Sequence, residues 1–370
     1  MRMKLRLLLK SIALTTFFFI AGNVGWGQVL LNENFNYGTS AGNLTTITTN
    51  WVMFSGATQV GYSASSLSMP TYSSTDIGGS ATFNTANTED ITRTFTAQTT
   101  GSIYASFLLN TANTNTTGNY FLHFRDNAGA FWGRFQSKQG SVAGKLLFGI
   151  SAGSVITFGT TEYDANTTYL VVIKYDFIAG AINDIASIYI LTAPTNTIPA
   201  TPEATSTATA ADPAQLSQIA IRQSTNIGTG TIDGLRVTQS WADAAGIDAT
   251  AASKTFNPAN SATGVVITSD ITISYDDYIR NIDNSVISNS NVGTLLTLKE
   301  TDGSGANVPF TATINAANQV ITINPDADLA NNKVYFVAIA DVEDINNNLT
   351  TGSNITFTTV AAATPSISGV

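Results

Sequence analysis

The chain has 370 residues, of which 43% are hydrophobic and only 11% charged, and its formal net charge is −9. That hydrophobic content excludes a disordered polar chain, and the absence of cysteine excludes disulfides, thiolate zinc sites and a cysteine nucleophile. Four basic residues lie in the first ten positions; the other 12 stand against 25 acidic residues, a net charge of about −13. Such a surface excludes nucleic acid and anionic membranes as partners.

Residues 1–27 have the features of a secretory signal peptide. A basic start is followed by an apolar run over 7–21, and the small residues Gly25 and Gly27 precede the expected cleavage site near Gln28. The apolar run is short for a membrane anchor, and no later segment is apolar enough to span a bilayer. We therefore expect a secreted, extracellular protein, free or attached to the cell surface.

From residue 28 to residue 243 almost every segment reads as strand or turn. Apolar and polar residues alternate in several segments that are separated by runs rich in Gly, Asn, Thr and Pro: 102–109, 119–125, 130–136, 168–177, 184–191 and 218–223. Many short strands in one domain predict an all-β, two-sheet sandwich or jelly roll.

The end of this domain is marked by TIDGLRVTQSWAD (231–243), a strand that runs into Trp241 and an acidic, Ala-rich stretch. QVLLNENFNYG (28–38) reads as the first strand of the mature chain. We expect 28–38 to pair with 231–239, so that the first and last strands close the domain near Trp241.

Three segments of this domain resemble a known family: LNENFNY at the start, TTYLVVIKYDFIAGAINDIASIYI in the middle and IDGLRVTQSWAD at the end. They are similar to concanavalin-A-like, laminin-G-like jelly rolls of secreted bacterial proteins. The middle segment resembles the long hairpin of that family, and the last one resembles its closing strand. The resemblance covers 28–243 and implies a fold but no particular activity.

A second unit follows the small-residue linker 244–253. Within 254–360, VPFTATINAANQVITINP (308–325) reads as two strands around an Asn-rich turn. The unit resembles Ig-like domains of bacterial surface-layer proteins, with DINNN in place of the usual Gly-Asn turn. Residues 361–370 read as another linker, and we expect it to lead to a further C-terminal part.

The sequence offers little for catalysis. Its one histidine, His123, lies in the middle of a strand, and no Gly-x-Ser-x-Gly elbow is present. A glycoside hydrolase needs two carboxylates roughly 5–10 Å apart across the substrate, and the closest match is Glu162 with Asp164. We predict a protein that is not an enzyme, with a divergent glycoside hydrolase or lyase accessory region as a weaker alternative.

The hairpin NYFLHFRDNAGAFWGRFQ (119–136) contains the candidate ligand-binding residues. If Arg125 faces Ala130 across the turn, one face of the hairpin carries aromatic and cationic side chains: Phe121, His123, Arg125, Trp132 and Arg134. Rings stack on sugars, and Arg or His donates to hydroxyl groups, so this face suits a carbohydrate or another polar polymer. The alternative is a purely structural set of cation–π contacts on an outer sheet.

Two carboxylates, Glu33 and Asp233, share the apolar faces of their strands. Such groups need backbone donors, an arginine or a cation, so both are candidate ligands for Ca²⁺. In the second unit an acidic turn resembles a calcium loop but lacks its Gly and its last Glu, and we interpret it as a solvated turn: Asp341, Glu343, Asp344, Asn346 and Asn348.

These features together predict a non-catalytic binding or adhesion protein. The jelly roll would engage a carbohydrate or a cell-surface polymer, and the Ig-like domain would act as a spacer. No cofactor is expected apart from the Ca²⁺ considered above. The alternative is a purely structural surface protein that binds no small ligand.

Overall fold

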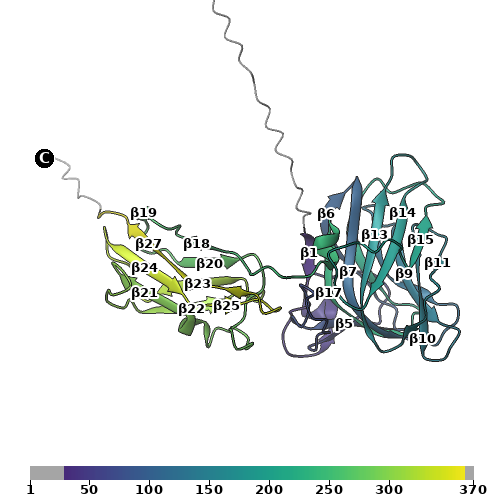
Figure 1. The fold of residues 1–370 in the computed structure, drawn as a ribbon, viewed down its shortest axis with the longest axis horizontal. Helices are drawn as coiled ribbons and strands as arrows, with labels where there is room; N and C mark the ends of the chain where they lie inside the picture. Colours follow the sequence, from purple (N-terminus) through teal and green to yellow (C-terminus); the bar gives the residue numbers. More distant parts are fainter. Residues whose placement is uncertain (1–28, 363–370) are drawn as a thin grey trace, which may run out of the picture.

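The computed structural model describes residues 29–362 and has two β-rich domains joined by a single connection (Figure 1). Each domain has its own buried hydrophobic core, one formed by residues 31–237 and the other by residues 252–357. The predicted signal peptide and most of the last predicted linker lie outside the described residues. The fold confirms the all-β prediction of a jelly-roll sandwich followed by an Ig-like sandwich.

The first domain consists of two antiparallel sheets. One has the order β15-β14-β13-β7-β17-β5-β4-β2, with β1 also on β17: Ala204–Thr207, Ile185–Leu191, Thr168–Phe177, Gly101–Ala112, Thr229–Thr238, Ser80–Asn84, Gly61–Ser63, Gly42–Asn43 and Val29–Glu33. The other has the order β11-β10-β9-β8-β16-β6-β3, with β12 also on β10: Thr157–Phe158, Lys145–Ser151, Phe131–Gln139, Asn119–Arg125, Leu216–Arg222, Asp90–Gln98, Val52–Ser55 and Tyr163–Asp164.

The predicted closure of this domain is confirmed. Strand β1 runs antiparallel to β17, with Leu31 opposite Val237 and Glu33 opposite Leu235. The long hairpin between β13 and β14 also forms as expected. Aromatic rings then fill the space between the two sheets; the ring of Phe121, for example, stacks 4.5 Å from that of Phe83. Alternation along each strand determines which side chains reach this core.

The outer faces of the two sheets differ. A short helix, α2 (Trp241–Ala245), and the segment around Tyr72 cover the outer face of the nine-stranded sheet and form a second buried apolar cluster with it. The Trp241 ring packs edge-on against Tyr104 and Tyr189. Within residues 29–362, no such buried cluster covers the outer face of the eight-stranded sheet. That face is therefore the open one.

The Ig-like domain consists of two four-stranded sheets and a small two-stranded one. The strands are β18-β20-β23-β22, β19-β27-β24-β21 and β25-β26: Lys254–Asn257, Ile271–Tyr275, Val320–Pro325, Phe310–Ile314; Ala262–Val265, Ser353–Thr359, Val334–Ile339, Leu296–Glu300; Val342–Glu343 and Leu349–Thr350. The hairpin predicted around the Asn-rich turn is β22–β23. The remaining helical turns are α1 (Leu44–Ile47) and the 3-10 turn η1 (Val292–Leu295).

The turn at 344–348 takes part in the joint between the domains, which corrects its interpretation as a solvated turn. Asp344 is fully buried. The amide of Asn346 donates to the carbonyl of Tyr72 at 3.4 Å and to the carboxylate of Asp248 at 2.9 Å. The backbone N–H of Asp248 in turn donates to Thr71. The predicted linker is thus held by hydrogen bonds to both domains.

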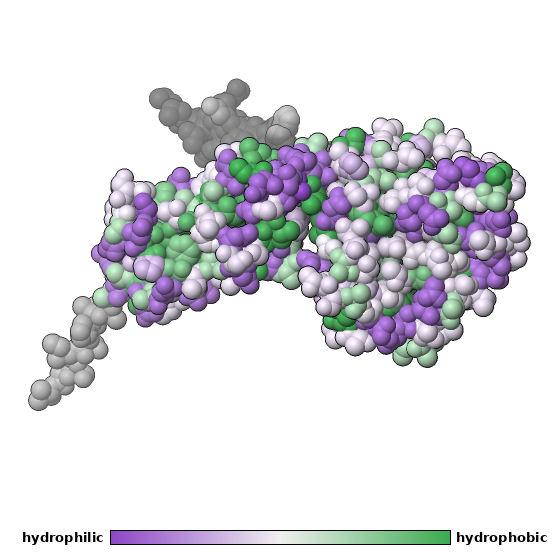
Figure 2. Space-filling model, turned by 90° about the horizontal axis from the view of Figure 1, so that it is seen from below, coloured by the Kyte–Doolittle hydropathy of each residue, from purple (hydrophilic) through white to green (hydrophobic). Residues whose placement is uncertain are grey.

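In the space-filling view the two lobes meet at a waist, and hydrophilic and hydrophobic residues are mixed over both (Figure 2). None of the helices formed by residues 29–362 has the length and apolar character needed to cross a membrane.

Candidate ligand-binding face

The register of the β8–β9 hairpin differs from the predicted one. Arg125 lies opposite Phe131 and Phe124 opposite Trp132, and the pairing shifts twice further along the hairpin. One cause is Gly133, which has a φ of +55°, a left-handed conformation that glycine adopts without a steric penalty. A Cβ at this position would also lie only 3.0 Å from the ring of Phe124. These β-bulges change which side chains face the core.

Three of the five candidate residues are therefore buried. Phe121 and His123 have no exposed surface, and Trp132 is 8% exposed. Phe121 and Trp132 belong to the hydrophobic core, where the indole N–H of Trp132 donates to Asp126 at 3.0 Å. In the described structure these three side chains are thus buried, and they do not present an open ring face on which a ligand could stack. Arg125 and Arg134 remain half-buried.

The structure brings those two arginines together with residues from other strands. We call this set the arginine–aromatic face; its members are half-buried and lie on the open side of the eight-stranded sheet: Phe54 (β3), Tyr120 and Arg125 (β8), Phe131 and Arg134 (β9), and Arg222 (β16).

Rings and guanidinium groups alternate across this face. The guanidinium carbon of Arg125 lies 3.7 Å from the centre of the Phe54 ring and 5.5 Å from that of Phe131. That of Arg134 lies 5.9 Å from the Phe131 ring and 5.2 Å from the Tyr120 ring. Arg222 lies 4.2 Å from the Tyr120 ring. Cation–π contacts thus hold each guanidinium in place.

His123 lies beneath this face and is neutral. Its Nδ1 is 3.0 Å from the carbonyl oxygen of Phe124, and its ring is 4.3 Å from that of Phe131. Burial lowers the pKa of His123 to about 3, and the nearby positive charges of Arg125, Arg134 and Arg222 also lower it. Its Nε2 has no hydrogen-bond partner among the described residues.

The positive charges of the face are compensated only in part: the carboxylates of Asp126 and Asp90 act on Arg125 without forming an ion pair with it. Within the described chain, neither Arg125 nor Arg134 forms an ion pair with a carboxylate; they donate to the side chain of Gln218 and the carbonyl of Phe131. Arg222 is 4.0 Å from Asp90, the outer limit for an ion pair. Burial lowers the pKa of Arg125 and Arg134, yet guanidinium groups stay charged in proteins.

Sequence reasoning missed four members of the face. Tyr120 and Phe131 lie in the hairpin 119–136 itself, but simple alternation predicts Tyr120 on its apolar side. Phe54 and Arg222 lie on strands β3 and β16, far from the hairpin in sequence. Their short alternating segments carried no signal that they would converge on this hairpin.

The carboxylate of Glu33 is bound by donors of the protein, the alternative considered for it. It accepts hydrogen bonds from the N–H of Phe35 at 2.7 Å and the indole of Trp51 at 2.9 Å, and it forms an ion pair with Arg93. The hydroxyl of Tyr37 donates to it at 2.6 Å. Among the described residues Glu33 is not part of any group of metal-ligating side chains.

Asp233 is also held by the backbone. Its carboxylate is fully buried and lies 2.6 Å from the N–H groups of both Leu67 and Gly234. Burial raises the pKa of Asp233 to about 8. Asp233 belongs to no metal-ligating group within residues 29–362, so the structure does not bring it together with Glu33 as a Ca²⁺ site.

The raised pKa of Asp233 predicts a pH-dependent stability. Between about pH 4 and pH 8 the folded chain holds a proton that the unfolded chain has released, so the folded state loses stability as the pH rises. We expect wild type to lose stability relative to Asp233→Asn by up to about 1.4 kcal/mol per pH unit in this window. Urea unfolding at several pH values measures the difference; a difference independent of pH would contradict the prediction.

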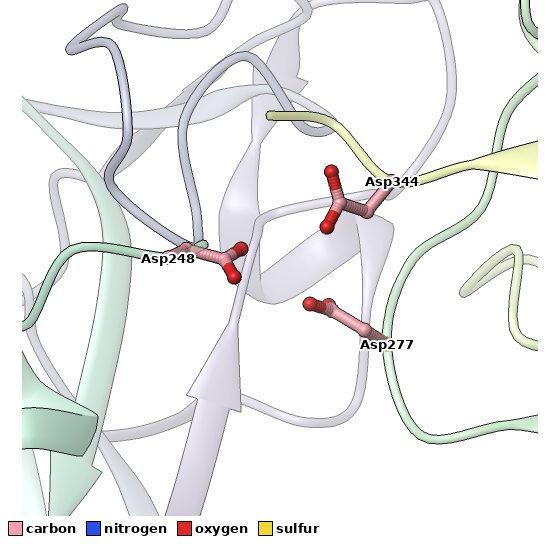
Figure 3. A group of neighbouring side chains, drawn as sticks. All are labelled: Asp248, Asp277 and Asp344. Carbon is pink, nitrogen blue, oxygen red and sulfur yellow. The ribbon is translucent and has the colours of Figure 1, made fainter. Parts of the chain in front are cut away.

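One group of acidic side chains does have the geometry of a cation site. Asp248 of the connection, Asp277 after β20 and Asp344 point toward one another at the domain joint, with ligand atoms within 4.8 Å (Figure 3). Their oxygens are of the kind that Ca²⁺ prefers. Beside them, a cleft of about 660 Å³ between the domains is lined by polar residues that include Arg93 and Arg236. Of the acidic turn at 341–348, only Asp344 belongs to this group.

The carboxylates considered for hydrolysis are engaged elsewhere. Glu162 accepts hydrogen bonds from the backbone and the side chain of Ser141, and Asp164 forms an ion pair with Lys145. Glu162 directly precedes the short strand β12 and Asp164 is its last residue, and neither is part of the arginine–aromatic face.

Comparison with known proteins identifies the second domain. Residues 248–359 match the family model of the bacterial Ig-like domain, close to the predicted 254–360. The match supports an Ig-like domain of bacterial type, and the surface-layer subtype remains a resemblance. A search of curated proteins finds no match.

Some solved structures have a distant similarity to this chain. They include the globular domain of T. cruzi calreticulin, with 8% identity, a TM-score of 0.31, and 54% of this chain and 87% of that one covered. A β-1,3-glucanase from Mycobacterium marinum has 12% identity, a TM-score of 0.32 and coverages of 57% and 99%. A carbohydrate-binding module from Bacillus subtilis has 12% identity, a TM-score of 0.25, and coverages of 50% of this chain and 93% of that one. Likeness at this level carries no argument about ligand or activity.

Proposed function

We propose that the protein is an exported, non-catalytic binding protein whose jelly roll engages a carbohydrate and whose Ig-like domain is a spacer. The observation that carries the proposal is the arginine–aromatic face, an open sheet surface on which half-buried rings and guanidinium groups alternate. Export is inferred from the signal-peptide features of residues 1–27.

The proposed mechanism is recognition by a preformed surface. The guanidinium groups are already held by cation–π contacts and by bonds to Gln218 and backbone carbonyls, so little side-chain freedom is lost on binding. Their free N–H groups donate to ligand oxygens, and the exposed part of Phe131 contacts the C–H surfaces of sugars. Such a site binds weakly by itself, and repeated attachment to a polymer strengthens it.

A glycan array with the whole chain tests this proposal. We expect one or more glycans to bind wild type and Phe131→Ala to lose at least tenfold in affinity, because Phe131 contacts both Arg125 and Arg134. Phe310→Ala in β22 of the Ig-like domain is the matched control and should bind as wild type does. A broad array without any binding would favour the alternative, in which the face is a structural set of cation–π contacts.

A further inference from the structure

We propose that the arginine–aromatic face is specific for an acidic polysaccharide whose sugars carry carboxylates, a polyuronate. This inference rests on the proposed carbohydrate-binding function of the same face and names its ligand class. Three observations carry it: the incomplete charge compensation, the position of the guanidinium groups on the rings, and their clustering around shared rings.

The first observation is a local excess of positive charge on an acidic chain. The whole chain has a net charge of −9, yet three arginines gather on one sheet face. Among the described residues only Arg222 has a carboxylate within 4.0 Å, that of Asp90. The carboxylates of Asp126 and Asp90 act on Arg125 without an ion pair, and Asp126 accepts hydrogen bonds from the N–H of Ala130 and from Trp132. A ligand carboxylate would supply the missing negative charge.

The second observation concerns what the face offers to a ligand. Arg125 covers the Phe54 ring at 3.7 Å and Arg222 covers the Tyr120 ring at 4.2 Å, so guanidinium groups occupy surface that a neutral sugar would use for stacking. The exposed part of the face is therefore rich in N–H donors. A planar guanidinium binds a carboxylate through two parallel hydrogen bonds, which are stronger than bonds to neutral hydroxyl groups.

The third observation is that these charges cluster around shared rings. Arg125 and Arg134 share the Phe131 ring, and Arg134 and Arg222 share the Tyr120 ring. The like charges of neighbouring arginines repel one another, and Arg222 accordingly lowers the pKa of Arg134. A polymer with a carboxylate on each sugar places negative charges in a row and relieves this repulsion at several points. The acidic remainder of the surface is screened beyond roughly 8 Å at physiological salt.

Polygalacturonate and its fully methyl-esterified form have the same sugar backbone, but only the first carries carboxylate charges. Comparing them separates the effect of charge from that of sugar shape. We expect affinity electrophoresis of the whole chain at physiological salt to show at least tenfold tighter binding to polygalacturonate than to the ester. Arg134→Gln should weaken binding to polygalacturonate at least tenfold. Arg134→Lys, which keeps the charge but loses the planar fork, should weaken it less. Lys299→Gln in β21 of the Ig-like domain is the matched control and should change nothing.

The outcomes distinguish this inference from the proposed function. Equal binding of the ester and the acid, lost together in Phe131→Ala, would overturn the polyuronate assignment and leave carbohydrate binding standing. Failure of both polymers and of every neutral glycan to bind would overturn the proposed function as well. Single-stranded DNA or a sulfated galactan bound as tightly as polygalacturonate would overturn the choice of a polyuronate. Unfolding midpoints equal to wild type would confirm that the variants are folded.

Discussion

Trp132→Ala is expected to lower the free energy of unfolding of the jelly roll by about 3–5 kcal/mol, the usual cost of removing a large core aromatic side chain. The indole is 8% exposed, lies in the hydrophobic core and donates to Asp126. Urea unfolding followed by tryptophan fluorescence measures the effect. Three of the four tryptophans (Trp51, Trp132 and Trp241) lie in the first domain and Trp26 lies in the predicted signal peptide, so in the mature chain the signal reports the first domain.

Trp132→Phe is the matched control for this prediction. It retains most of the apolar volume and loses the hydrogen bond to Asp126, so we expect a smaller loss, on the order of 1–2 kcal/mol. Trp132→Ala with wild-type stability and no glycan binding would instead place Trp132 in the ligand site, as the sequence-based hypothesis had it.

Glu33→Ala is expected to destabilise the jelly roll by about 3 kcal/mol, because it leaves charged and polar partners without an acceptor. The carboxylate accepts from the indole of Trp51 and the N–H of Phe35 and pairs with Arg93, and its own residue is 3% exposed. Arg93 is partly exposed, which places the expected loss at the lower end of the range for buried pairs. Urea unfolding followed by tryptophan fluorescence measures this loss of stability.

The matched variant here is Glu33→Gln, which retains an acceptor for the neighbouring N–H groups but removes the charge opposite Arg93. We expect Glu33→Gln to have a free energy of unfolding lower than that of wild type and higher than that of Glu33→Ala. If Glu33→Ala unfolded within about 0.5 kcal/mol of wild type, which is the range of an ordinary surface substitution, the network around Glu33 would contribute little.

The joint between the domains was only partly foreseeable. The position of the boundary followed from the end of the strand at Trp241 and the small residues after it. The role of α2, which extends the first domain to Ala245, depends on its packing against Tyr104 and Tyr189. The grouping of Asp248, Asp277 and Asp344 joins three segments that no local pattern connects.

The all-β class, the division into two domains, the pairing of the first strand of the jelly roll with its last one and the hairpins β13–β14 and β22–β23 could be predicted from the sequence; of the predicted pairing between 28–38 and 231–239, residues 29–33 and 235–238 form it. These features follow from alternation with a period of two, from turn residues and from composition, all of which are local. Which side chains form the open face depends on contacts between strands that are distant in sequence. The bulge at Gly133 sends Trp132 into the core, and sheet pairing brings Phe54 and Arg222 to the hairpin. Alternation cannot predict a bulge or a non-local neighbour, because packing between the sheets selects both.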